Sequence, residues 1–506
     1  MNDTTPTELE AVLDAAAQAA PALAASAPRV RAEALVAAAD ALDGAADELV
    51  PIAMRETGLA EARLRGELKR TTVQLRLFAE TVVDGAYLDV RIDDADPDFV
   101  LGPRPEVRRY LVPLGPVLNF AASNFPFAFS VAGGDSAAAL AAGSPVVVKA
   151  HEGHPELSQR TAEIVATALV AAGLPEGTFG IVFGRDSGIT ALRDPRIAAA
   201  AFTGSTGGGV ALAAIAANRP VPIPFFGELG SVNPVFVTPA AAEAGLGPLA
   251  EAFVASVSGS AGQLCTKSGF LFVPRGADLP VAAPAAGVAP HRLLHAGIAD
   301  GFRDRRERIL STDGVETVAG GDVTDDEAGA WATPTIARTD VATLRREREA
   351  LLDEAFGPLA IVVDYDDPAD LPGLVDEFFP GNLTGTIQTA PGEDPAGFTD
   401  LAAAIAAHSG RVIVNGWPTG VAVTPAMTHG GPFPATVGGA GTSVGTAAIS
   451  RFLRPVTYQN APDGILPPPL RDDNPWGVPQ RRSSAGESAS WGQLAASAGA
   501  TGGGAA

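Results

Sequence analysis

The stretch Pro145–Lys149, PVVVK, is a short apolar run that ends on a lysine. A continuous run of β-branched residues is typical of a strand that is buried on both faces of a sheet. Residues 156–172 then follow a helical pattern, which Gly173 and Pro175 end. Two more strands are predicted over residues 179–184 and 197–202. Strand, helix and strand at this spacing predict βαβ crossovers and therefore a parallel sheet.

The same alternation recurs later in the chain. Strands are predicted over 234–237 and 270–273, with a helix near 251–258 between them. We therefore expect two α/β domains. Residues 1–230 would form a dinucleotide-binding domain, completed by residues 411–475, and residues 231–410 would form a second domain. Residues 480–506 are rich in Ser, Ala and Gly and are predicted to be a disordered tail.

The composition excludes several classes of function. The chain has 506 residues, too many for one ordinary core, and a net charge of −23. A field of this sign would repel a phosphate backbone, so no nucleic-acid partner is expected. The sequence contains no apolar run of about 20 residues and begins without a secretory signal, so we expect no membrane partner. One cysteine in the whole chain favours a reducing, cytoplasmic location.

That cysteine, Cys265, lies in the small-residue stretch 262–269, GQLCTKSG. A single cysteine forms no intramolecular disulfide, so the thiol has no role in cross-linking the chain. Two interpretations are open at this point. The side chain is either a small buried hydrophobe or a nucleophile that its small neighbours leave accessible to a carbonyl carbon.

A glycine-rich turn, FTGSTGGG over residues 202–209, follows a predicted strand and precedes a predicted helix. Backbone amides at such a turn can approach a pyrophosphate, although the stretch lacks the usual G-x-G-x-x-G and could be only a tight turn. Lys149 at the end of its strand would face the same crevice, unless it is a surface lysine. His151 and His154 lack the spacing of a zinc motif, so no metal centre is expected.

Three polar residues stand in apolar surroundings. Asn124 lies in a loop where its amide could donate to an oxyanion. Glu228 follows two phenylalanines, an environment that predicts a raised pKa suited to a general base. Glu354 lies next to a turn. Each has a structural alternative: a capping amide, a paired carboxylate or a surface acid.

In chain order these signatures resemble the aldehyde dehydrogenase superfamily, and the resemblance spans residues 10–475. The strings 124–136 and 147–151, with Ile223-Pro224 before Glu228 and residues 231–234 after it, are similar to one bacterial branch. That branch contains the 2,5-dioxopentanoate (α-ketoglutaric semialdehyde) dehydrogenases and the NADP-type fatty aldehyde dehydrogenases. The resemblance implies an α/β fold with a Rossmann-like cofactor domain and an α/β catalytic domain. It also implies a small β bridging element, with strands near 105–115 and 451–459, and a homodimer or homotetramer.

The resemblance also implies roles for particular residues. Cys265 would attack an aldehyde to give a thiohemiacetal and then a thioester, and Asn124 would hold the oxyanion. Glu228 would activate the water that releases the acid. NADP or NAD would be held by Lys149, His151, Glu152, Gly204, Ser205, Gly209, Glu354 and Phe356. Glu152 stands where NAD-preferring relatives bind the adenosine ribose, and it would repel a 2′-phosphate, so NAD is expected to be accepted.

The implied substrate is a short semialdehyde such as 2,5-dioxopentanoate, although no arginine that would bind its carboxylate stands out in the sequence. The alternatives are a CoA-acylating enzyme, a broad-range or fatty aldehyde dehydrogenase, and a catalytically silent dinucleotide-binding homologue. Glu228 argues against the first, because a water-activating base serves hydrolysis. A thiol hydrolase is less favoured, since no histidine lies in a motif typical of a catalytic dyad.

Overall fold

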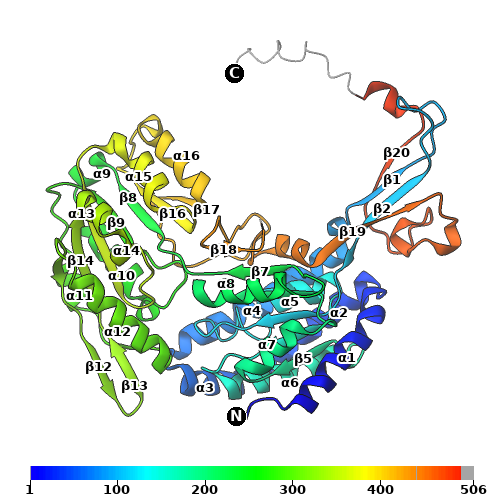
Figure 1. Cartoon of the computed structure of the whole chain (residues 1–506), viewed down its shortest axis with the longest axis horizontal. Helices are drawn as coiled ribbons and strands as arrows, with labels where there is room; N and C mark the ends of the chain where they lie inside the picture. The colour runs from blue at the N-terminus through cyan, green and yellow to red at the C-terminus, as the bar shows by residue number, and fades with distance from the viewer. Residues whose placement is uncertain (1, 440, 492–506) are drawn as a thin grey trace.

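The computed structural model describes residues 2–439 and 441–491, which form two lobes and a projecting arm (Figure 1). The first lobe is built on a six-stranded sheet in the order β18-β7-β6-β3-β4-β5. Its strands are β3 (Val117–Phe120), β4 (Val146–Lys149), β5 (Phe179–Val182), β6 (Ala199–Thr203), β7 (Phe225–Glu228) and β18 (Thr436–Val437). Its helices are α1 (Pro6–Ala24), α2 (Pro28–Gly44), α3 (Ala46–Thr57), α4 (Glu61–Asp84), α5 (Gly134–Ala142), α6 (Pro155–Ala171), α7 (Arg185–Arg193) and α8 (Thr206–Ala217).

The predicted parallel sheet is confirmed around β4. This strand pairs in parallel with β3 on one side and β5 on the other. Val146, Val147 and Val148 are completely buried, because helices cover both faces of the sheet and every side chain of the strand meets apolar neighbours. The apolar run therefore marks the centre of the first lobe.

The second lobe contains a seven-stranded sheet in the order β11-β14-β15-β9-β8-β16-β17 and a small sheet in the order β10-β13-β12. The strands of the large sheet are β8 (Pro234–Val237), β9 (Phe270–Pro274), β11 (Glu316–Ala319), β14 (Thr335–Asp340), β15 (Leu359–Tyr365), β16 (Asn382–Gln388) and β17 (Ser409–Val414). Those of the small sheet are β10 (His291–Arg292), β12 (Val323–Asp326) and β13 (Gly329–Ala332). The helices are α9 (Pro239–Glu243), α10 (Gly247–Ser258), α11 (Ala282–Ala286), α12 (Ala296–Leu310), α13 (Val341–Arg346), α14 (Arg348–Leu351), α15 (Leu371–Phe378) and α16 (Thr399–His408).

The arm is a four-stranded sheet in the order β19-β2-β1-β20, which extends away from both lobes (Figure 1). Its strands are β1 (Val90–Asp93), β2 (Val107–Pro113), β19 (Leu453–Gln459) and β20 (Gln480–Ser483). The prediction that the chain is disordered from residue 480 is wrong for residues 480–491. β20 pairs in parallel with β1, and the ring of Trp491 lies edge-on to Phe99. Residues 492–506 lie outside the described residues.

The parallel strands of the first sheet align the loops that carry the predicted site residues. Phe120 at the end of β3 stands opposite Lys149 and Phe202, and Thr203 at the end of β6 stands opposite Glu228. Because the carboxyl ends of parallel strands share one edge, the segments that follow them converge on a crevice at that edge. We propose that the boundary between the lobes lies in the connection between Glu228 and Pro234, where the chain passes from the first sheet to the second.

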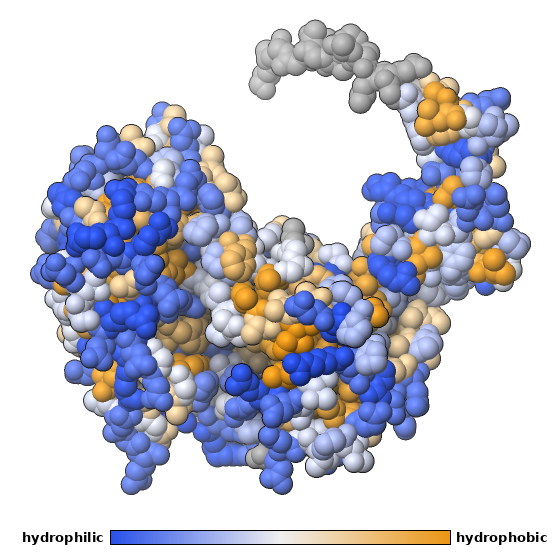
Figure 2. All heavy atoms as spheres, viewed as in Figure 1, coloured by the Kyte–Doolittle hydropathy of each residue, from blue (hydrophilic) through white to orange (hydrophobic). Residues whose placement is uncertain are grey.

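Figure 2 shows hydrophilic residues over most of this face and apolar residues gathered near the middle of the view, in the region of α8. This helix is rich in alanine, and Val210 near its start is 41% exposed. Among the described helices, none combines the length and the apolar character that crossing a membrane requires.

Candidate active site

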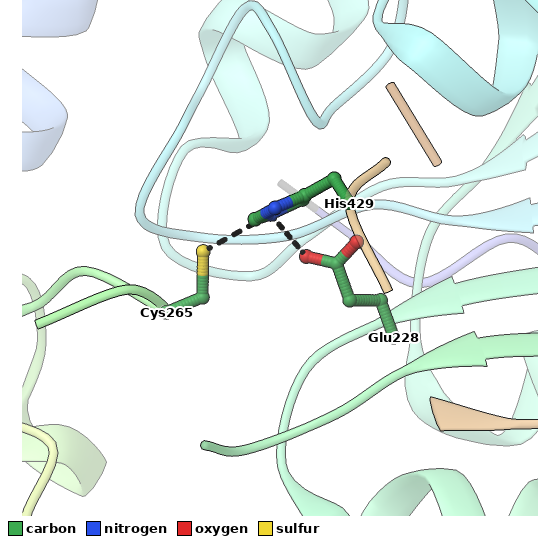
Figure 3. Close-up of side chains that lie close together, drawn as sticks. All are labelled: Glu228, Cys265 and His429. Atoms are coloured by element: carbon green, nitrogen blue, oxygen red, sulfur yellow. Dashed lines mark hydrogen bonds and ion pairs between the residues drawn. The ribbon is translucent and has the colours of Figure 1, made fainter. Parts of the chain in front are cut away.

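Three side chains from distant parts of the chain meet at the border between the lobes (Figure 3). His429 Nε2 lies 3.5 Å from Cys265 Sγ and 2.9 Å from Glu228 Oε1. His429 and Glu228 are buried, and Cys265 is half-buried. The Cys265 sulfur, a carboxylate oxygen of Glu228 and a ring nitrogen of His429 lie within 4.8 Å of one another. A thiol, an imidazole and a carboxylate at these distances can pass a proton from sulfur to nitrogen and on to oxygen.

The loop that carries Cys265 has an unusual backbone. Ser260, Ala261 and Gly262 adopt positive φ angles of 53°, 54° and 64° in succession. Non-glycine residues rarely adopt this region, and such strain persists only where surrounding structure holds it. At Gly262 a Cβ atom would lie 2.3 Å from the carbonyl oxygen of Gly357, so only glycine fits. This strained segment ends three residues before Cys265 and positions that residue at the crevice.

Asn233 fixes the other side of this loop. Its fully buried Nδ2 donates to the carbonyl oxygens of Cys265 and Lys267, at 2.8 and 3.0 Å. Its Oδ1 accepts from the Ser231 hydroxyl and from both the backbone and the hydroxyl of Thr384. One amide therefore ties the start of β8, the Cys265 loop and β16 together.

The environment of Cys265 keeps its thiol protonated. Burial raises the pKa of the Cys265 thiol, and the carboxylates of Glu228 and Glu354 raise it further, while the positive charge of Arg70 opposes them. A thiolate is the reactive form, so a neighbouring base has to accept the proton when an aldehyde is attacked.

The predicted direction of the pKa shift of Glu228 is wrong. Burial acts to raise the pKa of this carboxyl, but His429 and the Ser443 hydroxyl, which donates to Oε2, outweigh that effect and leave the pKa lowered. The phenylalanines beside Glu228 in the sequence do not determine its charge, because partners from residues 429 and 443 do. Glu228 is therefore an ionised acceptor at neutral pH.

Asn124 lies beside the loop that carries Cys265. Its side chain is buried, and its Nδ2 donates to the carbonyl oxygen of Gln263 at 3.0 Å. Arg63 in turn donates to the Asn124 carbonyl oxygen at 2.6 Å. An amide nitrogen has two hydrogens, so one N–H of Asn124 is left for a further acceptor.

The residues predicted to bind the adenosine half of a cofactor follow β4. Lys149 Nζ lies 3.7 Å from Glu152 Oε1, with the glutamate side chain 72% exposed and the lysine 13% exposed. His151 is largely enclosed, with its ring 5.5 Å from that of His295, and burial lowers its pKa well below the usual value. Its Nδ1 accepts from the Gly153 backbone at 3.0 Å, so the ring orders this turn.

The glycine-rich turn connects β6 to α8. Ser205 caps the helix by accepting from the Gly208 backbone at 3.3 Å, and Gly204 N donates to the Glu228 carbonyl oxygen at 3.0 Å. A Cβ atom on Gly209 would lie 2.1 Å from Leu229. The glycine therefore lets α8 approach β7 closely, which turns the helix N-terminus and its free amides toward the crevice.

Glu354 and Phe356 lie on the loop between α14 and β15, and both are half-buried. The Glu354 carboxylate packs against Gly230, where a Cβ atom would lie only 2.4 Å from Oε2, and burial raises its pKa. Lys267 holds this loop, because its buried Nζ donates to the carbonyl oxygens of Ala355 and Leu359 at 2.6 and 2.7 Å. The contribution of Lys267 was not predicted.

Sequence reasoning also missed His429. The histidine stands alone in a stretch rich in glycine and proline, residues 428–434, with no spacing that indicates a catalytic role. Its backbone is fixed by Thr442 and Ser443, through hydrogen bonds of 2.9 Å each. His154, by contrast, is structural: its ring nitrogens contact Ser158 Oγ and the Ala122 carbonyl oxygen.

Residues 1–283 match the aldehyde dehydrogenase family, and the chain belongs to this family. It is an NAD(P)-dependent aldehyde dehydrogenase, and the resemblance stated from the sequence is confirmed. The chain is 43% identical over 434 residues to an α-ketoglutaric semialdehyde dehydrogenase of Acinetobacter baylyi, covering 85% of this chain and 82% of the relative. It is also 43% identical over 448 residues to α-ketoglutaric semialdehyde dehydrogenase 2 of Azospirillum brasilense, covering 87% and 84%.

Solved structures confirm the predicted fold. A 3,6-anhydro-L-galactose dehydrogenase in complex with NADP superposes with a TM-score of 0.75 at 22% identity, covering 90% of this chain and 92% of that one. Aldehyde dehydrogenase 21 of Physcomitrella patens, in complex with its product succinate, gives a TM-score of 0.74 at 22% identity and covers 92% of both chains.

Replacing Asn233 by Leu should disorder the Cys265 loop. The change leaves two buried carbonyl oxygens and the Thr384 backbone without partners, so we expect a loss of about 2–4 kcal/mol in the free energy of unfolding. Urea unfolding measures this loss, and oxidation of aldehydes should fall with it. Asn218→Leu, at an exposed residue that bonds only to its own helix, is the matched control. Equal stability of the two variants would contradict this role of Asn233.

Proposed function

We propose that this enzyme oxidises a short semialdehyde, such as 2,5-dioxopentanoate, to the acid through a thioester on Cys265. The observation that carries the chemistry is the contact of one imidazole nitrogen with both the thiol and the Glu228 carboxylate. The substrate class is supported by the 43% identity to two α-ketoglutaric semialdehyde dehydrogenases.

His429 acts first, by accepting the thiol proton. Because burial and two carboxylates raise the pKa of Cys265, sulfur alone does not ionise at neutral pH. Nε2 at 3.5 Å accepts the proton as sulfur bonds to the aldehyde carbon. The resulting oxyanion lies beside the free N–H of Asn124 and the Cys265 backbone N–H.

When bound, NAD(P)⁺ would supply the hydride acceptor. Loss of hydride from the thiohemiacetal carbon would leave a thioester on Cys265. Two features support this proposal: the glycines and the helix N-terminus at residues 204–209 could offer amides to a pyrophosphate, and Lys149 at the end of β4 and Glu354 would hold the riboses. Phe356, on the same loop as Glu354, would pack near the nicotinamide end.

Glu228 acts last. Its lowered pKa keeps it ionised, and its oxygen is within 4.8 Å of the sulfur, so it can take a proton from water that attacks the thioester. This base favours hydrolysis over transfer of the acyl group to a thiol such as CoA. A catalytically silent homologue would have lost the thiol or the base, and both are present.

We propose that NAD is accepted as well as NADP, because the exposed Glu152 carboxylate stands beside Lys149 and would repel a 2′-phosphate. We also propose a homodimer or homotetramer. Both β19 and β20 of the arm are outer strands, and so is β17 of the second lobe, which leaves unpaired backbone groups for a second copy.

Glu228→Gln should separate the two halves of the reaction. Removing the water-activating base slows hydrolysis of the thioester more than hydride transfer. Rapid mixing should show a burst of about one NAD(P)H per active site, followed by turnover at least about 100-fold slower than in the parent enzyme. Cys265→Ala is the control and should give neither burst nor turnover. Full turnover in Cys265→Ala would refute the proposed mechanism.

His429→Gln should change the pH dependence of kcat/KM. Without the imidazole only the ionised fraction of Cys265 reacts, and the pKa of this thiol is raised. The rate should therefore increase about tenfold per pH unit between pH 6 and 9, starting about 100-fold or more below the parent enzyme. His408→Gln, at a histidine on α16 that binds Asp376, is the control. A profile identical to that of the parent enzyme would exclude His429 as the base.

Glu152→Gln should shift cofactor preference toward NADP. Removing the carboxylate removes a charge that opposes the 2′-phosphate, so the ratio of kcat/KM for NADP to that for NAD should increase about tenfold. Glu156→Gln, at a nearby exposed glutamate paired with Arg55, controls for net charge. A strong preference of the unmodified enzyme for NADP would contradict the role given to Glu152.

A further inference from the structure

Two arginines near the nucleophile have no carboxylate partner. Arg70 lies on α4 of the first lobe and Arg411 on β17 of the second. Within the described part of the chain, neither forms an ion pair, and each keeps a buried N–H without an acceptor: Nη1 of Arg70 and Nε of Arg411. A buried unpaired guanidinium donor costs free energy, and it is unexpected in a chain with a net charge of −23.

Arg70 is close to the reacting atoms. Its guanidinium stacks over the ring of Phe129 at 5.0 Å, and that ring lies 6.0 Å from the ring of His429, which contacts the sulfur. Its positive charge also opposes the rise in the pKa of the Cys265 thiol. The position of the unpaired donor is therefore within electrostatic reach of the sulfur.

Glu67 precedes Arg70 by three residues on α4, and one of its carboxylate oxygens is already hydrogen-bonded. Glu67 Oε1 accepts from the backbones of Phe127 and Ala128 at 2.8 and 2.9 Å, and Oε2 lies 3.9 Å from Arg63. One carboxylate thus faces two arginines along α4, and its Oε2 has no hydrogen-bond partner among the described residues.

Arg411 approaches from the second lobe. Its Nη2 donates to the Pro418 carbonyl oxygen at 2.9 Å, which orients the guanidinium, and its charge interacts with Cys265. The neighbouring Gly410 packs against Gly430, the residue after His429, where a Cβ atom would lie 2.0 Å from the carbonyl oxygen. Arg411 is thus held beside the His429 loop.

Apolar side chains pack beside Arg70, whose guanidinium lies over Phe129. Phe125 and Phe129 pack with residues of the 421–427 segment, Val421, Val423 and Met427, around the buried Val444. Such walls exclude water and strengthen an interaction between a guanidinium and an anion.

We propose that Arg70 and Arg411 form the subsite that binds the distal carboxylate of the aldehyde substrate. The inference rests on the proposed function and deepens it. In a five-carbon semialdehyde four bonds of about 1.5 Å separate the aldehyde carbon from the carboxylate carbon, a span of about 5 Å. A carboxylate at that distance from the carbon bound to sulfur would accept the two unused N–H groups. The substrate carboxylate would then be held by one arginine from each lobe.

The test compares 2,5-dioxopentanoate with pentanal, an uncharged aldehyde of the same length. Arg70→Met and Arg411→Met keep an apolar stem and remove the charge. In each variant kcat/KM for the semialdehyde should fall about 10- to 100-fold more than kcat/KM for pentanal, mainly through a higher KM. Arg65→Met, an exposed arginine of α4 paired with Glu61 and Asp47, should leave the ratio of the two substrates unchanged.

A second measurement does not depend on oxidation. Cys265 is the only thiol, so alkylation by iodoacetate and by iodoacetamide reports on this site alone. The rate of the anionic reagent relative to the neutral one should fall about tenfold in Arg70→Met and Arg411→Met, and not in Arg65→Met.

The outcomes distinguish the two proposals. Unchanged substrate and alkylation ratios in both variants would overturn the carboxylate subsite. If the parent enzyme prefers pentanal while the alkylation ratios still depend on Arg70 and Arg411, the proposed semialdehyde substrate is wrong and the anion subsite is retained.

Discussion

The hydrogen bonds of Asn233 are the constraint on which the site depends. A side-chain amide buried at the start of β8 holds the carbonyl oxygens of Cys265 and Lys267 and the backbone of Thr384. Because buried polar groups are costly when unpaired, these bonds are made together or lost together. Lys267 extends this network, since its Nζ donates to backbone carbonyl oxygens of the loop that carries Glu354 and Phe356. Cys265 and the loop of Glu354 and Phe356 are thus positioned by one connected set of bonds.

The site is assembled across the border between the lobes. Glu228 ends β7 of the first sheet, Cys265 precedes β9 of the second, and His429 belongs to the segment that returns the chain to the first lobe. β18 pairs with β7 directly at Glu228, which brings the returning segment against the base. The proton route from sulfur to carboxylate therefore exists only when both lobes are in place.

Much of the fold and part of the site could be predicted because their signals are local. The run Val146–Val148 indicated a buried central strand. The lone cysteine in its glycine-punctuated stretch left a buried hydrophobe and a nucleophile both open, and its role as nucleophile remains a proposal. The roles given to Glu228 and Lys149 remain proposals, although both lie at the predicted edge. The predictions that failed concern features that are set by contacts between residues distant in sequence. His429 has no periodic or motif context, and the lowered pKa of Glu228 comes from residues about 200 positions away. β20 is ordered by pairing with a strand near residue 90. In the sequence Arg70 is an ordinary arginine of a predicted helix, and only the structure shows that its guanidinium forms no ion pair among the described residues.

His429 Nε2 contacts both Cys265 and Glu228, and this arrangement sets the order of the proton transfers. Nε2 of His429 is the atom that approaches both sulfur and carboxylate, so a proton taken from Cys265 has Glu228 as its next acceptor. A carboxyl that has received this proton cannot take another from water. The proton released in the first half must therefore reach solvent before the second half begins. The rate at which protons leave the crevice would therefore limit how soon hydrolysis can follow hydride transfer.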